Sequence, residues 1–357
     1  MGQIPADLLS GQRIAVVYSF QAPDEPSDRW YDRWRTRVVM SYGEALERLG
    51  MHPYYCDIDT FCGQAIAKTL PGISAVISVN AGVRPISHFA LVPAVAAWAT
   101  LPIIPSFADA VIAGERKDLA SLVAQHCGLQ LPATFGAADI DVARREPLLI
   151  AKPRDLGGSV GIKIIAGPEI RPDDFQGGQI VQRFLPGYDV TIPVFFDYQN
   201  TTLTCGFGAI YVPDDPQPTS WYYSREIKEA YVGGTTPQNV RRVLAPVSPE
   251  LARLIVGYCV ALGAESFARL DFRLLADPTN LTSLMPEQVR FLEINPMPTV
   301  CSGLAFVDGI RQVLSRYHFA EMERLNLRPE DDYEVIAFIL ANALAAKLHP
   351  SEMHDGH

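Results

Sequence analysis

Polar side chains with ligand chemistry alternate with apolar ones in two short segments, FARLDFRLL (267–275) and QVRFLEINP (288–296). The polar members are Arg269, Asp271, Glu293 and Asn295. Side chains two apart on a strand share a face, so each segment, if it is a strand, presents its polar pair on one side. If the two strands are neighbours, one face gathers two carboxylates, an amide and a guanidinium. The intervening Phe272, Leu292 and Ile294 would then face the core.

This polar face has the composition of a magnesium site. Two carboxylates and an amide oxygen are hard ligands, and Mg²⁺ commonly shares its octahedral coordination with the phosphates of a substrate. We therefore predict that Asp271, Glu293 and Asn295 bind metal. The alternative interpretation is a solvated strand face crossed by salt bridges.

A second candidate site lies in AKPRDLGGSVGIKII (151–165), where a lysine follows an apolar run and a glycine-rich turn comes next. The backbone N–H groups of Gly157, Gly158 and Ser159 can line an anion site, because glycine lets the chain approach a phosphate closely. Lys152 would add a positive charge. The pattern is neither a P-loop nor a dinucleotide-binding turn. The alternatives are a hairpin without a ligand and a solvated lysine.

The composition is that of an ordinary folded protein: of 357 residues, 48% are hydrophobic and 20% are charged, and two or three subdomains are expected. The net charge of −10 provides no overall basic field, so we expect no nucleic-acid partner. The chain has neither a run of about 18 apolar residues nor the pattern of a signal peptide, so no membrane association is expected. Six cysteines without a CxxC pair predict reduced thiols and a cytoplasmic protein.

The elements that would position these residues change character along the chain. An apolar strand at 13–19, a helix at 33–49 closed by Gly50 and strands at 52–58 and 74–80 predict a parallel α/β sheet up to about residue 110. From about residue 133, short apolar runs separated by turn residues predict an antiparallel sheet. Long helices are predicted at 119–129 and 250–264, and 309–346 is mostly helical.

Taken in order, these motifs resemble the ATP-grasp superfamily and, within it, the D-alanine–D-alanine ligase branch. The motif K-P-x5-S-x-G-I begins at Lys152, and the second polar strand ends in E-I-N-P. AGERKDLASLVAQHCGLQLPA (113–133), VQRFLPGYDVTI (181–192) and SREIKEAYVGG (224–234) resemble further segments of that branch. Five segments in the family's order are far more specific than any one of them.

The resemblance implies an α/β ATP-grasp fold with an α+β C-terminal half, in which an N-terminal parallel α/β domain precedes two subdomains that clamp ATP. The implied domains are an N-terminal substrate domain (1–112), a central lid subdomain (113–190), a C-terminal subdomain with the metal site (191–346) and a flexible tail (347–357).

The resemblance also implies roles for individual residues. Lys117 and Lys152 would hold the α- and β-phosphates of ATP, the loop of Gly157, Gly158 and Ser159 would cover the β- and γ-phosphates, and Lys228 would close over them. Adenine and ribose would lie against Gln182, Arg183, Phe184, Leu185 and Asp189. Two Mg²⁺ ions would bind Asp271, Glu293 and Asn295. Arg269, Lys228 and Ser159 would be the catalytic residues, with Arg269 and a backbone N–H near Thr299 stabilising an oxyanion.

The chain departs from the branch mainly where substrates would bind. Gln182 and Asp189 stand where the family commonly has glutamates, so the acceptor chemistry for adenine and ribose is kept. The segments 18–34 and 78–93 lack the family's glycine-rich turn, its substrate-anchoring glutamate and its H-G-x-x-G-E-D-G stretch. After the metal strand the usual glycine is missing, and Ser302 matches the substrate-carboxylate serine poorly.

Three functions stay open at this point. The leading one is an ATP-dependent ligase that activates a carboxylate or similar oxygen and joins it to an amino acid amine, releasing ADP and phosphate, in secondary metabolism such as mycosporine-like amino acid or dipeptide biosynthesis. The second is an authentic D-alanine–D-alanine ligase of cell-wall synthesis. The third is a nucleotide-binding protein without catalysis. The expected partners are ATP, small amino acid and carboxylate substrates and, as in many family members, a second copy of the chain.

Overall fold

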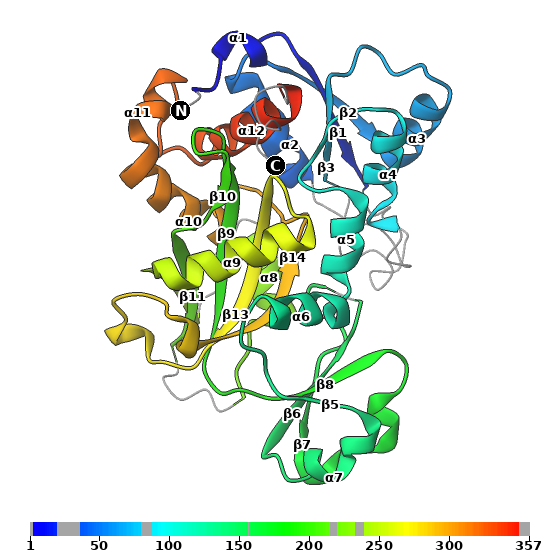
Figure 1. Cartoon of the computed structure of the whole chain (residues 1–357), viewed down its shortest axis with the longest axis vertical. Coiled ribbons are helices and arrows are strands. Elements are labelled where there is room, and N and C mark those ends of the chain that lie inside the picture. The colour runs from blue at the N-terminus through cyan, green and yellow to red at the C-terminus, as the bar shows by residue number, and fades with distance from the viewer. Residues whose placement is uncertain are drawn as a thin grey trace.

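The computed structural model describes residues 3–19, 36–79, 88–155, 157–214, 220–232 and 239–349. Three sheets follow one another along the long axis of the molecule (Figure 1). The first is parallel, and the other two are antiparallel. The predicted α/β fold with an antiparallel C-terminal half is therefore confirmed.

The N-terminal sheet has the strand order β2-β1-β3-β4. Its strands are β1 (Arg13–Tyr18), β2 (His52–Asp57), β3 (Ala75–Ser78) and β4 (Ile103–Ile104), and the helices between them are α2 (Thr36–Arg48), α3 (Ile58–Ile66) and α4 (Leu91–Trp98). A short α1 (Ala6–Leu9) precedes the sheet, and α5 (Ala108–Glu115) follows it. Strand β1 is apolar throughout residues 14–17 because both faces of a parallel sheet are buried under helices.

The small antiparallel sheet has the order β5-β8-β6-β7. It consists of β5 (Thr134–Phe135), β6 (Leu148–Pro153), β7 (Lys163–Ala166) and β8 (Gln179–Arg183), with α7 (Ile140–Ala143) beside it. Helix α6 (Lys117–His126) leads into this sheet from the N-terminal part. A small core of its own, which includes Leu149 and Val181, holds the sheet together.

The six-stranded sheet has the order β12-β11-β9-β13-β14, with β10 on the end of β9. Its strands are β9 (Tyr188–Asp197), β10 (Thr202–Thr204), β11 (Phe207–Pro213), β12 (Val240–Pro246), β13 (Phe267–Leu274) and β14 (Val289–Asn295). Helix α8 (Arg225–Val232) precedes β12, and α9 (Pro249–Leu262) precedes β13. Ser248 caps the start of α9 by accepting from the Leu251 N–H, and Gly263 ends it with a positive φ of 85°.

The C-terminal helix α12 (Asp332–Leu348) joins the first sheet to the third. Residues 335–345 are buried without interruption, because this helix packs on α2 on one side and on β9 on the other. Helices α10 (Ala305–Val313) and α11 (Phe319–Arg324), with a π-helical turn between them, complete this part. Residues 347 and 348, which the sequence analysis assigns to the tail, continue α12.

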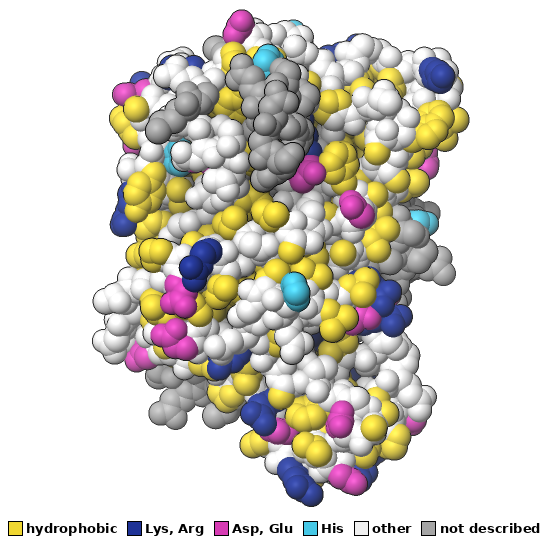
Figure 2. All heavy atoms as spheres, viewed as in Figure 1, with side chains coloured by type: hydrophobic (Ala, Val, Ile, Leu, Met, Phe, Trp, Pro, Cys, Tyr) yellow, Lys and Arg dark blue, Asp and Glu magenta, His cyan; other side chains and the backbone are white. Residues whose placement is uncertain are grey.

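Three further observations concern the described part of the molecule. Among the described helices, none has the length and apolar character needed to cross a bilayer. All six cysteines lie in described ranges and are free thiols. On the face shown in Figure 2, basic side chains are scattered among acidic and hydrophobic ones.

One prediction for the polar strands is wrong. Strands β13 and β14 are antiparallel neighbours, so the condition for a shared polar face is met, and Phe272 and Ile294 are buried in the core as expected. Leu292 instead lines a cleft, because the register shifts after Asp271: Asp271 lies opposite Glu293, but Phe272 lies opposite Phe291. This β-bulge leaves Leu292 as the extra residue, and strict alternation fails there.

Two buried tyrosines differ in whether the hydroxyl has a hydrogen-bond partner, so together they test how much such a bond contributes to stability. The hydroxyl of Tyr258, which is 0% exposed and packs on Phe291, has no hydrogen-bond partner among the described residues. The hydroxyl of Tyr42 donates to the Pro298 carbonyl at 3.4 Å and so ties α2 to the loop after β14. We expect Tyr258→Phe to leave the free energy of unfolding unchanged or to raise it, and Tyr42→Phe to lower it by about 0.5–1.5 kcal/mol. Chemical denaturation of both variants measures this, and an equal loss in the two would contradict it.

Candidate active site

Most of the predicted site residues line one cleft between the small antiparallel sheet and the six-stranded sheet. It encloses about 860 Å³ of space, part of which is open to solvent. The predicted residues on its walls are Lys117, Lys152, Ser159, Gln182, Arg183, Phe184, Leu185, Asp189, Lys228, Asp271 and Glu293. These side chains come from elements spread over more than a hundred residues of sequence, so only the tertiary fold brings them together.

A second cavity of about 510 Å³ adjoins the cleft along the same charged strand pair. It contains the remaining predicted residues, Gly157, Gly158, Arg269 and Asn295, together with the apolar side chains of Phe89, Ile294 and Met297. Lys117 and Glu293 line both spaces. The two cavities therefore share a wall, and that wall carries one positive and one negative charge.

The register of β13 and β14 sets the geometry of this wall. Arg269 lies opposite Asn295, and Asp271 lies opposite Glu293. The Arg269 guanidinium binds the Asp271 carboxylate in a bidentate manner, at 3.1 Å from Nε to Oδ1 and 2.8 Å from Nη2 to Oδ2. Thr191 Oγ1 on β9 donates to the same Oδ1 at 2.8 Å. Burial would lower the pKa of Arg269, but Asp271 and Glu293 outweigh it and raise the pKa, so this side chain stays charged.

Glu293 is surrounded by cations. Its Oε2 lies 3.3 Å from the Nζ of Lys117. Burial alone would raise the pKa of this carboxyl, but Lys117, Lys228, Lys152 and Arg269 together lower it to about 2. Arg269 is already paired with Asp271, so three lysines face the single carboxylate of Glu293, an excess of positive charge that a polyanionic ligand would neutralise.

Lys152 is buried beside this cluster. Its side chain at the end of β6 is 7% exposed, and its Nζ lies 3.5 Å from the Leu292 carbonyl. Burial lowers the pKa of Lys152 to about 8, although Glu293 opposes the shift. A bound anion would restore the charged form, because it would compensate for the lost hydration.

The donor set fits magnesium. Asp271 and Glu293 face each other across the strand pair, and both line the cleft. Asn295 lies two pairs further along, and its side-chain oxygen accepts from the Met297 N–H at 2.9 Å. The described residues contain no cluster of three or more His, Cys, Asp or Glu side chains with metal-binding geometry. Mg²⁺ does not need one, since one or two carboxylates and the phosphates of a ligand usually suffice.

The far end of the cleft presents hydrogen-bond acceptors. Gln182 is buried, and its Oε1 has no hydrogen-bond partner within the described part of the chain. Asp189 accepts from the Tyr223 N–H at 2.6 Å and pairs with Arg273 at 3.2 Å, and both contacts use Oδ2. Among the described residues this leaves Oδ1 for a ligand hydroxyl.

Two covering segments meet over the cleft at Tyr223. Ser159, held at a positive φ of 62° in the glycine-rich loop, donates from Oγ to the Tyr223 carbonyl at 3.0 Å. The Tyr223 ring stacks on Tyr211 with centroids 3.9 Å apart, and the Nζ of Lys228 lies 5.3 Å from the same ring. The glycine-rich loop and the segment that carries Lys228 are therefore held closed through one residue.

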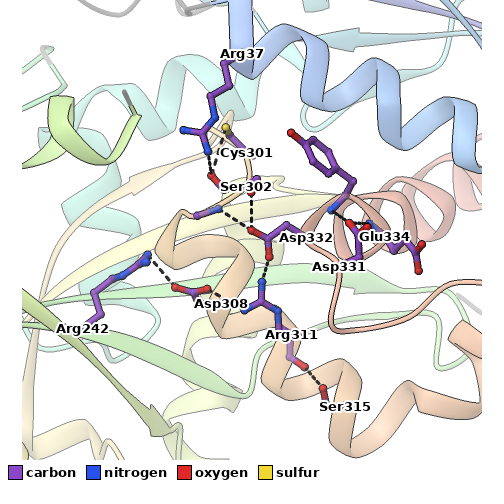
Figure 3. A network of polar contacts seen from close by, with 12 residues as sticks. Arg37, Arg242, Cys301, Ser302, Asp308, Arg311, Ser315, Asp331, Asp332 and Glu334 are labelled. Carbon is purple, nitrogen blue, oxygen red and sulfur yellow. Dashed lines mark hydrogen bonds and ion pairs between the residues drawn. The ribbon is translucent and has the colours of Figure 1, made fainter. Parts of the chain in front are cut away.

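Two predicted residues make contacts other than those expected. Arg183 lines the cleft, but its guanidinium forms a bidentate ion pair with Glu146 at 2.6 and 2.7 Å on the exposed side of β8. Ser302 belongs to a polar network beyond the cavities: its Oγ donates to Asp332 at 2.8 Å, and Arg37 donates to its carbonyl (Figure 3). This network ties the loop after β14 to α2 and α12.

The sequence analysis missed three residues of the site. Arg273 is buried, donates from Nε to the Leu185 carbonyl at 2.8 Å and pairs with Asp189. Its position two residues after Asp271 could have revealed it, because the alternation that relates Arg269 to Asp271 continues to it. Thr191 and Tyr223 carry no comparable signal, since their roles depend on strand register and on the covering segment.

The chain matches no protein-family model and no curated protein sequence. Solved structures do resemble it. D-alanyl-alanine synthetase A from Vibrio cholerae superimposes with a TM-score of 0.62 at 13% identity over 95% of this chain and 99% of that one. The D-alanine–D-alanine ligase from Bacillus anthracis complexed with ATP gives 0.59 at 12% identity, over 88% and 96%.

VanG D-Ala:D-Ser ligase from Enterococcus faecalis gives a TM-score of 0.58 at 13% identity over 94% of this chain and 100% of that one. Each likeness extends over nearly the whole of both chains, so it concerns the arrangement of all three sheets. At these identities the likeness establishes the fold alone. The chain has the ATP-grasp fold of the D-alanine–D-alanine ligases, which its motifs resemble.

Proposed function

We propose that this protein is an ATP-dependent carboxylate–amine ligase that releases ADP and phosphate. The observation that carries the proposal is the shared wall: Lys117 and Glu293 line both the 860 Å³ cleft and the 510 Å³ cavity. A nucleotide in the first space and a carboxylate in the second would meet at this wall. Transfer of a phosphoryl group requires such a meeting, with positive charge on both sides.

The cleft residues would bind ATP from its base to its phosphates. Gln182 Oε1 would accept from the adenine amino group, and Asp189 Oδ1 from a ribose hydroxyl. Lys117, Lys152 and Lys228 would neutralise the phosphates, while the loop around Ser159 excludes water. Mg²⁺ held by Asp271, Glu293 and Asn295 would supply further neutralisation of the phosphate charge.

In the second cavity Arg269 has the position for an oxyanion partner. An acyl phosphate formed there is attacked by an amine, and negative charge develops on the carbonyl oxygen before phosphate leaves. Arg269 stays charged and is held by Asp271, so it needs no reorganisation when that charge appears. Because no protein nucleophile is required, a serine or cysteine triad has no role in this scheme.

The substrates are proposed to belong to secondary metabolism, such as mycosporine-like amino acid or dipeptide synthesis. The support comes from the sequence, because residues 20–34 and 80–87 of the two segments that depart from the ligase branch, 18–34 and 78–93, lie outside the described residues. A D-alanine–D-alanine ligase is the second candidate, favoured by the names of the structural neighbours. A cytoplasmic location and a homodimer remain predictions.

The metal residues can be tested by neutralisation. Asp271→Asn or Glu293→Gln should reduce Mg²⁺-dependent ADP release at least about 100-fold, because a neutral amide cannot balance metal and phosphate charge. The assay measures ADP with a panel of amino acids and carboxylates, and thermal unfolding checks that the variants are folded. Glu287→Gln, on the exposed turn before β14, is the matched control. Near wild-type turnover in either site variant would refute the metal assignment.

Nucleotide binding should take up protons above neutral pH. The pKa of Lys152 is lowered to about 8 without ligand, and phosphates beside it raise that value, so ATP affinity should fall as pH rises through about 8. Calorimetric titrations at this pH in buffers of different ionisation enthalpy measure the uptake. Lys152→Arg should bind ATP without it, since arginine stays protonated. The control variant Lys163→Arg, on the exposed part of β7, should still take up protons on binding ATP. If proton uptake persists in Lys152→Arg, another group binds the proton and the assignment to Lys152 is wrong.

The substrate proposal separates the two ligase candidates. In the segment 29–35, Trp30, Tyr31 and Trp34 alternate with arginines, which suits a larger anionic substrate better than D-alanine. We expect millimolar D-alanine alone to give no ADP release above background, and a bulkier carboxylate together with a small amino acid to give it. Robust synthesis of D-alanyl-D-alanine would instead support the cell-wall ligase. ATP binding without ADP release on any substrate pair would favour a non-catalytic nucleotide-binding protein.

A further inference from the structure

Gln182 and Thr134 form a cross-strand pair at the end of the cleft. They are direct partners in the antiparallel pairing of β5 with β8. Gln182 is 4% exposed and lines the cleft, and its Nε2 donates to Thr134 Oγ1 at 3.0 Å. The other end of the amide, Oε1, is buried and has no partner among the described residues. A buried acceptor without a partner is destabilising, so a ligand that brings a donor to it binds more tightly.

The hydroxyl of Thr134 determines which end of the amide points away from it. A hydroxyl has one proton, and Thr134 donates it to the Pro132 carbonyl at 3.3 Å. While the hydroxyl keeps this bond, it accepts from Gln182. In that arrangement the amide presents Nε2 to Thr134, because the reversed amide would set two acceptors against each other. Oε1 is then the end of the Gln182 amide that can accept a hydrogen bond from a ligand.

The choice of amide end has a chemical consequence for a purine base. A 6-aminopurine such as adenine offers a donor at position 6, whereas a 6-oxopurine such as hypoxanthine or guanine offers an acceptor there. A carboxylate at position 182 would present an acceptor however it turned. An amide does so in only one of its two orientations, so a glutamine at this position needs a second group to select it.

We propose that Thr134 is a positioning residue that makes the cleft selective for 6-aminopurine over 6-oxopurine nucleotides, by holding the Gln182 amide with Oε1 available to the base. The inference rests on the proposed binding of a nucleotide in this cleft. It adds a determinant of base selectivity that lies on β5, a strand that the sequence analysis did not connect with the nucleotide.

The test compares the dissociation constants of ATP and inosine triphosphate, which differ at position 6 of the base. The wild-type protein should bind ATP at least about tenfold more tightly, the ratio expected for one mismatched buried hydrogen bond. Thr134→Ser keeps the hydroxyl and should keep the ratio. Thr134→Val keeps the β-branched shape on an exposed strand position but frees the amide to turn, so ATP should bind more weakly, inosine triphosphate more tightly, and the ratio should approach one.

A double variant distinguishes orientation from a structural effect. Gln182→Glu in the Thr134→Val background should restore the preference for ATP, because a carboxylate has no donor to offer position 6. If Thr134→Val weakens both nucleotides equally and keeps the wild-type ratio, Thr134 acts only on structure and the proposal is overturned, while nucleotide binding stands. If the wild-type protein binds neither nucleotide, the proposed function itself fails and the inference falls with it.

Discussion

The site depends on the charge balance around Glu293. A buried carboxylate is unstable without partners, and a group of buried lysines is unstable without anions. In this chain each compensates the other: Lys117 lies 3.3 Å from Glu293, and Lys152, Lys228 and Arg269 add to its field. Because Asp271 already pairs with Arg269, three lysines remain around the one carboxylate of Glu293, and the protein balances their charge only in part. The remaining positive charge suits a polyanion, such as the nucleoside triphosphate of the proposed function.

The rest of the fold holds the partners of this cluster in place. Strands β13 and β14 set Asp271 opposite Glu293, and the bidentate contact from Arg269 fixes the first carboxylate. Helix α12, apolar on every side, unites the N-terminal sheet and the six-stranded sheet in one core. Lys117 begins α6, directly after the last helix of the N-terminal part, so the positions of the two sheets decide where this lysine meets Glu293.

Two hydrogen bonds between the backbone of Tyr223 and neighbouring side chains hold the cover over the cleft. The N–H of Tyr223 reaches Asp189, and its carbonyl accepts from Ser159, so the same residue connects the strand behind the ligand with the loop above it. Asp189 keeps an oxygen for a ligand while it holds the cover. In the proposed function, a nucleotide hydroxyl at Oδ1 and the cover at Oδ2 would therefore share one carboxylate.

The sequence by itself determined the elements and the polar face. Apolar runs and turn residues predicted the parallel and antiparallel sheets, and alternation in two strands predicted that Arg269, Asp271, Glu293 and Asn295 would gather, because a strand has a fixed period of two. Alternation could not reveal the bulge that turns Leu292 toward the cleft, since a bulge depends on how two strands pair. The contacts of Thr134 with Gln182, of Tyr223 with Asp189 and of Lys117 with Glu293 join residues far apart in the chain. Only the tertiary structure decided them, because local sequence sets the conformation of a segment but not which distant segment packs against it.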